Sequence, residues 1–92
     1  MRYVYLLKSI CKDFFYIGST SNIQKRLVEH QEGKCPTTKR YLPVRLVYYE
    51  AYASDLDANN REQKLKQYGS SLQKLKQRIK RSSREGLGED TN

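Results

Sequence analysis

Three side chains in one short stretch, FYIGSTSNIQKRLVEHQEG, could act together on one anionic group. Tyr16 comes first, and Arg26 and the chain's only histidine, His30, follow it. Because residues four apart in a helix share a face, Arg26 and His30 should lie one above the other, beside the apolar positions of that helix. An arginine can clamp a phosphate, and a tyrosine or histidine can move a proton. The alternative for Arg26 and His30 is an ordinary surface pair.

The segment between positions 61 and 84 contains nine basic residues and a single acidic residue, Glu62. Ala58 and Leu65, four residues before it and three after it, place Glu62 on the apolar side of a predicted helix. A carboxylate in such a place must be paired or must hold a metal ion. A salt bridge, within the basic segment or to Arg26, and a metal site are therefore the two interpretations of Glu62.

The charge of the chain favours a polyanionic partner. The formal net charge is +8, and much of it lies between positions 61 and 84. Such a surface binds a phosphate backbone by counterion release, so we expect DNA as the partner, with RNA as the alternative. An acidic membrane is less favoured, because the basic helices lack bulky aromatic anchors. The residues expected to contact phosphates are Lys39, Arg61, Lys64, Lys66 and Lys74.

The elements that must position these residues follow the order β-β-α-β-α-α. RYVYLLKS at 2–9, FFYIGS at 14–19 and RLVYYEAY at 45–52 are rich in aromatic and β-branched residues and predict three strands. The first two strands would form a hairpin that sets Tyr5 beside Tyr16. This order predicts an α+β domain in which a small three-stranded antiparallel sheet, with one face in solvent, is flanked by helices.

Polar residues and glycines mark where the helices begin and end. Ser21 with Gln24 is typical of a capping box at the start of the first helix, and Gly33 is expected to end that helix. Ser54 is the expected N-cap of the second helix, which should end at Gly69. A third helix should follow directly, because an apolar stripe of helical period continues there.

Length and composition limit the class of protein. The 92 residues predict one domain over 1–81, and residues 82–92 have nothing to bury and are predicted to be disordered. No apolar run approaches the roughly 18 residues that span a bilayer, and the N-terminus does not resemble a secretion signal. We therefore expect a cytoplasmic protein in which Cys11 and Cys35 stay reduced.

The segment VYL at 4–6, followed by YIG at 16–18, resembles the signature of the GIY-YIG nuclease superfamily. In QKRLVEH, Arg26 and His30 match the family's helix arginine and its tyrosine-or-histidine position one turn later. In REQKLKQYG, Glu62 matches the family's metal-binding glutamate. The likeness covers about residues 1–80 and extends to small stand-alone bacterial members, which resemble the nuclease domains of excision-repair and structure-specific endonucleases.

The chain departs from the family pattern in three places. Tyr3 and Val4 stand where the first motif has glycine and isoleucine, a minor change to strand packing. Ser19 stands where some members have a lysine directly after YIG. A downstream asparagine of some members has no clear counterpart, although Lys74 falls near that place. These departures bear on the catalytic rate more than on the fold.

The resemblance implies a metal-dependent endonuclease that hydrolyses phosphodiester bonds in DNA. Glu62 would hold a divalent cation, Mg²⁺ first and Mn²⁺ as the alternative, between the second helix and the sheet face with the two tyrosines. Arg26 would clamp the phosphate, and Tyr16 would act as the general base, with Arg26 and the metal favouring its phenolate. Tyr5 would orient water or substrate, and His30 would relay the proton or hydrogen-bond Tyr5.

Two other classes of function stay open. The chain could be a nucleic-acid-binding module on a nuclease scaffold with weak or lost catalysis, which the missing lysine and asparagine favour. It could also be a basic accessory protein that binds RNA or a protein complex without chemistry. If it cleaves DNA, the absence of a dedicated specificity domain in the sequence favours recognition of substrate shape, with a protein partner as a further source of specificity.

Overall fold

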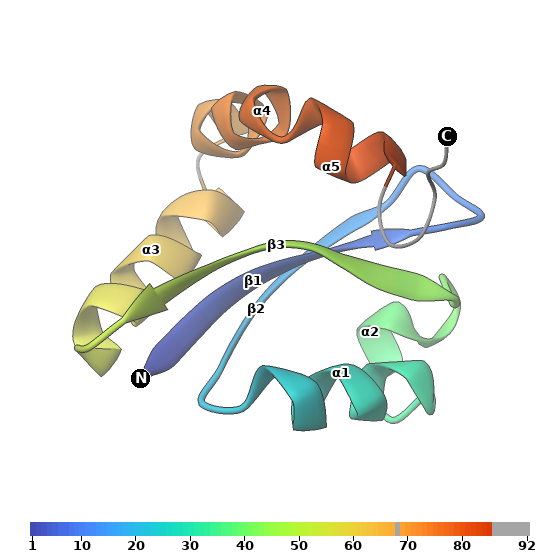
Figure 1. Ribbon diagram of the computed structural model, residues 1–92, viewed down its shortest axis with the longest axis horizontal. Helices are drawn as coiled ribbons and strands as arrows, with labels where there is room; N and C mark the ends of the chain where they lie inside the picture. The colour runs from blue at the N-terminus through green and yellow to red at the C-terminus, as the bar shows by residue number, and fades with distance from the viewer. Residues whose placement is uncertain (68, 86–92) are drawn as a thin grey trace.

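The protein folds around a three-stranded antiparallel sheet, as its computed structural model shows (Figure 1). The structure describes residues 1–67 and 69–85. The central strand is β1 (Arg2–Ser9), which pairs with β2 (Phe15–Thr20) on one side and β3 (Val44–Tyr52) on the other. The predicted α+β class and the predicted three-stranded antiparallel sheet are confirmed.

Helices cover both faces of this sheet (Figure 1). One face carries α1 (Ile23–Gln31) and α2 (Pro36–Lys39), and the other carries α3 (Asp55–Gln67), α4 (Gly69–Arg78) and α5 (Lys80–Glu85). The expectation that one face would be in solvent was therefore wrong. The physical reason lies in β1, whose four central residues are all apolar or aromatic, so each face must be covered.

The alternation of side chains along β1 divides the core into two clusters. Val4 and Leu6 pack with Ile17 against the helices that follow β3, where Ala58, Leu65 and Leu75 are buried. Tyr5 and Leu7 form the second cluster with Val44, and Leu27 of α1 packs against it. The two tyrosines and α1 therefore lie on one side of the sheet, and α3 lies on the other.

Helix boundaries differ from the predicted ones at three places. Asn22, rather than Ser21, is the N-cap of α1, because its Oδ1 accepts a hydrogen bond of 3.1 Å from the backbone N–H of Lys25. Gly69 is the first residue of α4 and does not end the preceding helix. The short α2 was not predicted, and Pro36 at its first position is typical of a helix start.

The last described helix, α5, runs through Glu85 and so extends into the segment from 82 onward that was predicted to be disordered. Ser83 is buried, and its backbone carbonyl accepts a hydrogen bond from Arg45 of β3. The rest of the predicted tail, residues 86–92, lies outside the described residues. Within the described part of the chain, no helix has the length and apolar character needed to cross a membrane.

The two cysteines lie in different surroundings. Cys11 is exposed near the turn between β1 and β2, and Cys35 is buried directly before α2. Both are free thiols, as the sequence predicts.

A polar network around Glu50 joins β3 to α3. Arg61 donates to both carboxylate oxygens of Glu50, with 3.0 Å from Nε to Oε1 and 3.0 Å from Nη2 to Oε2. Tyr48 and Tyr52 each donate their hydroxyl to the same carboxylate at 2.6 Å. Arg61 was expected to contact nucleic-acid phosphates. In the protein alone its guanidinium is engaged by a largely buried carboxylate of the sheet, and a phosphate contact of Arg61 stays a prediction.

The glycine of the YIG segment has a packing role in the hairpin. The antiparallel register sets Gly18 opposite Tyr5, and the ring of Tyr5 lies over it. A Cβ at Gly18 would overlap both Cζ and the hydroxyl oxygen of Tyr5, which leaves no room for any side chain. Only glycine therefore allows Tyr5 to lie flat against β2.

Replacement of Glu50 by glutamine should lower the free energy of unfolding at neutral pH, because the half-buried Arg61 loses its charged partner. The expected loss is about 2 kcal/mol. Burial acts to raise the pKa of Glu50, but the hydrogen bonds from Arg61, Tyr48 and Tyr52 outweigh it and leave the pKa below its ordinary value. A depressed folded pKa stabilises the fold above the unfolded pKa, and this contribution is lost as pH falls through the folded pKa. Urea unfolding of both proteins should therefore show a difference that shrinks below about pH 4.

The control for this experiment is Glu32→Gln. Glu32 forms an exposed pair with Lys34, with 3.1 Å from Nζ to Oε1. Because exposed ion pairs contribute little, the loss of this one should change stability by less than about 0.5 kcal/mol. A Glu50→Gln protein as stable as wild type at neutral pH would contradict the assignment of Glu50 as a structural anchor.

Replacement of Gly18 by alanine should lower the free energy of unfolding, because the ring of Tyr5 must move out of its buried position. The expected loss is about 1–3 kcal/mol, as for other overpacked cores. Thermal unfolding followed by circular dichroism measures the change. Gly69→Ala is the matched control, since among the described residues a Cβ placed there would meet no atom within 4 Å beyond its chain neighbours and the backbone of its own helix. Equal stability of the two variants would show that the close contact with Tyr5 is relieved at little cost.

Candidate active site

Tyr5 and Tyr16 lie side by side on the face covered by α1, as the hairpin register predicts. Their ring centroids are 6.3 Å apart. His30 of α1 completes a group of three rings, with its centroid 5.9 Å from that of Tyr5 and 5.1 Å from that of Tyr16. His30 is fully buried, so the helix face with Arg26 and His30 turns toward the sheet and is not an ordinary surface pair.

A chain of hydrogen bonds fixes the imidazole of His30. The hydroxyl of Tyr5 lies 2.9 Å from His30 Nε2, and His30 Nδ1 lies 2.8 Å from Thr38 Oγ1. Because the Thr38 hydroxyl donates to the carbonyl of Cys35, its oxygen accepts from Nδ1–H, which leaves Nε2 to accept from Tyr5. Burial lowers the pKa of His30, and Arg26 acts in the same direction, so the ring is neutral near pH 7.

Tyr5 is a fixed, protonated member of the site. Burial raises the pKa of Tyr5 to about 12, although hydrogen bonding from Arg26 acts in the opposite direction. The side chain is only 4% exposed. Its hydroxyl donates to His30, which is the second of the two roles that the sequence analysis gave to that histidine. Tyr5 is thus suited to orienting a neighbour rather than to taking a proton from water.

Tyr16 is less buried than Tyr5 and lines an open cavity of about 440 Å³ at the outer edge of β2. Thr37 of α2 borders this cavity from one face of the sheet, and Leu65 and Lys66 of α3 border it from the other. The two groups of helices can meet there because β2 is an edge strand. The side chain of Tyr16 therefore borders an open cavity that water and a substrate can enter.

In the protein alone burial has the larger effect on the pKa of Tyr16, although Arg26 acts on it in the expected direction. Burial is the largest influence and raises the pKa of Tyr16, and the thiol of Cys35 adds to this rise. Lys66 and Arg26 act to lower the pKa but do not offset burial. Tyr16 is consequently protonated at neutral pH, and a base role requires further positive charge at the site.

Arg26 is held in place by a neighbour on its own helix. Its Nη1 lies 3.0 Å from Oε1 of Glu29, and the two side chains are 36% and 30% exposed. Hydrogen bonds with Glu29 and Tyr5 raise the pKa of Arg26, so it stays a cation at any relevant pH. Glu29 was missed in the sequence analysis, although its position three residues after Arg26 is a usual spacing for an ion pair on a helix.

Glu62 lies on the helix that covers the other face of the sheet. Its neighbours Ala58 and Leu65 pack against Val4 and Leu6, so the predicted position of a metal site, between this helix and the face with the two tyrosines, is wrong. Glu62 is 17% exposed and pairs with Lys66, with 2.9 Å from Oε2 to Nζ. This salt bridge within the basic segment is one of the two interpretations that the sequence left open.

Lys66 links the two halves of the site. Its ammonium group pairs with Glu62, and its side chain lines the same cavity as Tyr16. The site is therefore assembled around the edge of β2 and not on a single face. Among the predicted phosphate contacts, Lys39, Lys64, Lys66 and Lys74 are exposed, and Arg61 is engaged with Glu50.

A single carboxylate, that of Glu62, is the donor that this site offers to a divalent cation. Among residues 1–67 and 69–85, no three His, Cys, Asp or Glu side chains lie close enough together to hold a metal ion. Mg²⁺ usually keeps several water ligands and takes one or two carboxylates together with substrate phosphates. The mostly buried Glu62 fits a cation bound in that way.

Comparison with known proteins places the chain in a family. A family model of the GIY-YIG catalytic domain matches residues 1–76. A UPF0213 protein from Staphylococcus haemolyticus is 43% identical over 76 residues, which cover 80% of this chain and 89% of that protein. A UPF0213 protein from Clostridium perfringens is 41% identical over 68 residues, which cover 72% of this chain and 71% of that protein.

A solved structure supports the same assignment at the level of the fold. The solution NMR structure of a UPF0213 protein from Bacillus halodurans is similar, with a TM-score of 0.58 and 25% sequence identity. The comparison covers 99% of this chain and 100% of that one. The family match spans every residue of the candidate site, from Tyr5 to Lys66. The chain therefore belongs to the GIY-YIG catalytic-domain family, a family of nuclease domains that generally use divalent metal ions.

Proposed function

We propose that this protein is a metal-dependent endonuclease that hydrolyses phosphodiester bonds in DNA and selects its substrate by shape rather than by base sequence. One observation supports this proposal most directly. Tyr16 lines an open cavity at the edge of β2 that Lys66, the partner of Glu62, also lines, while the ring of His30 lies against the same tyrosine. RNA is the alternative polymer.

In the proposed reaction, Tyr16 takes the proton of the attacking water. The water oxygen forms a bond to phosphorus, its proton passes to the phenolate oxygen of Tyr16, and the bond from phosphorus to the leaving oxygen breaks. Arg26, always charged and held by Glu29, stabilises the charge that develops on the phosphoryl oxygens. A divalent ion bound by Glu62 would act as a Lewis acid on the phosphoryl group.

Tyr5 and His30 keep this machinery in position. The hydroxyl of Tyr5 donates to a neutral His30, so its oxygen is free to accept a hydrogen bond from Arg26 and to fix the guanidinium. Thr38 orients His30 from the other side. The exposed lysines near the cavity would bind the flanking phosphates, with affinity that falls as salt rises.

A second candidate function is a nucleic-acid-binding module without efficient catalysis, on the same scaffold. Two observations favour it: Lys66 already neutralises Glu62, and burial raises the pKa of Tyr16. In that case a protein partner would supply the substrate specificity and the catalytic residues. The two functions share the basic surface, so binding alone does not separate them, and cleavage does.

Replacement of Tyr16 by phenylalanine should reduce DNA cleavage by roughly 100-fold or more while the fold survives, because only the hydroxyl is lost. Nicking of branched, flapped and plain duplex DNA with and without Mg²⁺ measures the effect. Tyr41→Phe is the matched control, since the ring of Tyr41 stacks on Phe14 with a centroid distance of 3.7 Å and phenylalanine keeps that contact.

The pH dependence of cleavage adds a second readout for Tyr16, whose pKa is raised above the ordinary value. The wild-type rate should increase about tenfold per pH unit between about pH 7 and 9, because the phenolate fraction rises in that proportion below the pKa. The Phe variant should lose that dependence. Full cleavage by the Phe variant would move the base role away from Tyr16.

Replacement of Glu62 by glutamine should abolish Mg²⁺-dependent cleavage and leave DNA binding in place, because the amide keeps the size of the side chain but binds a cation weakly. The DNA affinity of the wild-type and Glu62→Gln proteins, measured by fluorescence anisotropy, should fall by about tenfold or more between about 50 and 200 mM salt. Asp57→Asn, at an exposed acid of the same helix, is the control that should cleave normally.

Either of two results would count against the endonuclease. A Glu62→Gln protein that cleaves at the wild-type rate would remove Glu62 from the metal site. A wild-type protein that binds DNA with the expected salt dependence but nicks none of the three substrates would favour the binding module.

A further inference from the structure

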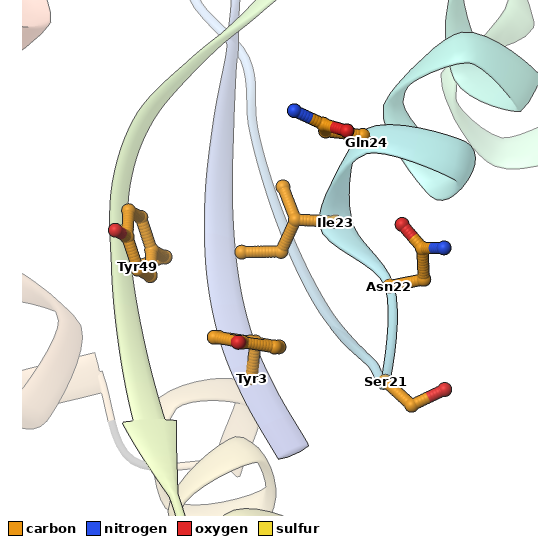
Figure 2. A pocket seen from close by; sticks show the side chains of 6 residues that line it. All are labelled: Tyr3, Ser21, Asn22, Ile23, Gln24 and Tyr49. Atoms are coloured by element: carbon orange, nitrogen blue, oxygen red, sulfur yellow. The ribbon is translucent and has the colours of Figure 1, made fainter. Parts of the chain in front are cut away.

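An open pocket of about 370 Å³ lies beside the candidate active site, between the start of α1 and the outer part of the sheet (Figure 2). Among the described residues it shares no lining residue with the cavity at Tyr16, and the proposed reaction makes no use of it. The residues that line it are Tyr3, Ser21, Asn22, Ile23, Gln24 and Tyr49.

Two tyrosines form one wall of this pocket. The rings of Tyr3 and Tyr49 meet edge to face, with centroids 5.9 Å apart and an interplanar angle of 68°. Tyr49 is 54% exposed even though it lies on a face of the sheet that helices cover. Exposed aromatic surface of this kind often marks a binding site. In Figure 2, Ile23 extends from α1 toward the two rings, so the pocket has an apolar floor next to an aromatic wall.

The two tyrosines of this pocket are neighbours of Tyr5 in the sheet. Tyr49 of β3 pairs with Tyr5 in the antiparallel register, and Tyr3 lies two residues before Tyr5 on the same face of β1. A ligand seated against Tyr3 and Tyr49 would therefore lie two residues along β1 from Tyr5, which forms a hydrogen bond with Arg26.

The pocket at Tyr3 and Tyr49 has an uncharged lining, whereas the cavity next to it is lined by charged side chains. Within the described part of the chain, no Asp, Glu, Lys, Arg or His lines the pocket, and its polar side chains beyond the tyrosines are Ser21, Asn22 and Gln24. The neighbouring cavity of about 320 Å³ shares Ser21 and Asn22 and is lined as well by Lys25, by Arg26 and by its partner Glu29. A neutral aromatic site thus adjoins a cationic one, which is the order of groups in a nucleotide: a flat neutral base next to a phosphate.

We propose that the pocket at Tyr3 and Tyr49 binds an unpaired base of the nucleic-acid strand whose phosphate lies at Arg26. The proposal rests on the proposed function and deepens it by naming the substrate class. Aromatic side chains stack on bases only where the bases are splayed out of a duplex, and they do so with little preference for base identity. The pocket therefore favours DNA with unpaired nucleotides, such as a flap beside a duplex, over a fully paired duplex.

The test measures binding without metal, so that it does not depend on cleavage. Fluorescence anisotropy in EDTA compares a duplex carrying a short single-stranded flap with a blunt duplex of the same length. Tyr49→Ala should weaken flap binding by about tenfold and leave blunt-duplex binding unchanged, because one stacking contact is lost. Tyr49→Phe should bind like wild type, and so should Leu56→Ala, which removes a side chain that is 67% exposed on α3.

A second measurement uses the wild-type protein and so does not depend on the folding of a variant. Replacing the flap nucleotides one at a time by abasic sites should reveal one position at which loss of the base costs about tenfold in affinity. The Tyr49→Ala protein should show no further loss at that position. Equal affinity for all abasic flaps would overturn the proposal.

The outcomes separate this inference from the proposed function. A wild-type protein that binds flaps as predicted but cleaves nothing would support the pocket and contradict the endonuclease. A protein that cleaves DNA while Tyr49→Ala leaves both flap binding and flap cleavage unchanged would support the endonuclease and overturn the pocket, which would then be open to a peptide of a partner protein. An equal loss of flap and blunt-duplex affinity in Tyr49→Ala would also overturn it.

Discussion

The buried hydrogen bond between Tyr5 and His30 joins the sheet to α1, and the geometry of the site depends on it. A buried polar group without a hydrogen-bond partner lowers the free energy of unfolding by about 1–3 kcal/mol. The hydroxyl of Tyr5 and the imidazole of His30 are both buried, so they must lie within hydrogen-bond distance of each other. This constraint sets the rotation of α1, which in turn brings Arg26 beside the hydroxyl of Tyr5. Thr38 extends the same constraint to α2 through the other nitrogen of the imidazole. Gly18 of β2 allows this arrangement, since only glycine leaves room for the ring of Tyr5.

The position of β1 in the middle of the sheet explains why the site lies at an edge. The four central residues of β1 fill both faces of the sheet with core side chains, so neither face has room there for the reacting phosphate. The edge of β2 is where helices from the two faces come near each other, and there Tyr16 shares a cavity with Lys66. The fold thus combines residues from α2 and α3 that could not approach each other across the sheet itself.

Much of this arrangement could be predicted from the sequence because it depends on local periodicity. The alternation in the hairpin placed Tyr5 beside Tyr16, and the helical spacing placed Arg26 and His30 on one face. The face on which Glu62 lies could not be predicted, because a helical stripe shows that a residue faces the core but not which side of a sheet the helix covers. The pairing of Arg61 could not be predicted for a related reason, because its partner Glu50 belongs to a different element. The direction of the pKa shift of Tyr16 depends on burial, which the charges of neighbouring residues do not reveal.

The complete burial of the only histidine gives the protein a built-in spectroscopic reporter. With one imidazole in the chain, its ring resonances in a nuclear magnetic resonance spectrum need no assignment by mutation. The proton on Nδ1 is held by Thr38 and shielded from solvent, so it should exchange slowly enough to be seen. Any ligand that shifts the ring of Tyr5 or the guanidinium of Arg26 would alter the chemical shift at Nε2. The interior of the site can therefore be observed directly in solution, without any label attached to the chain.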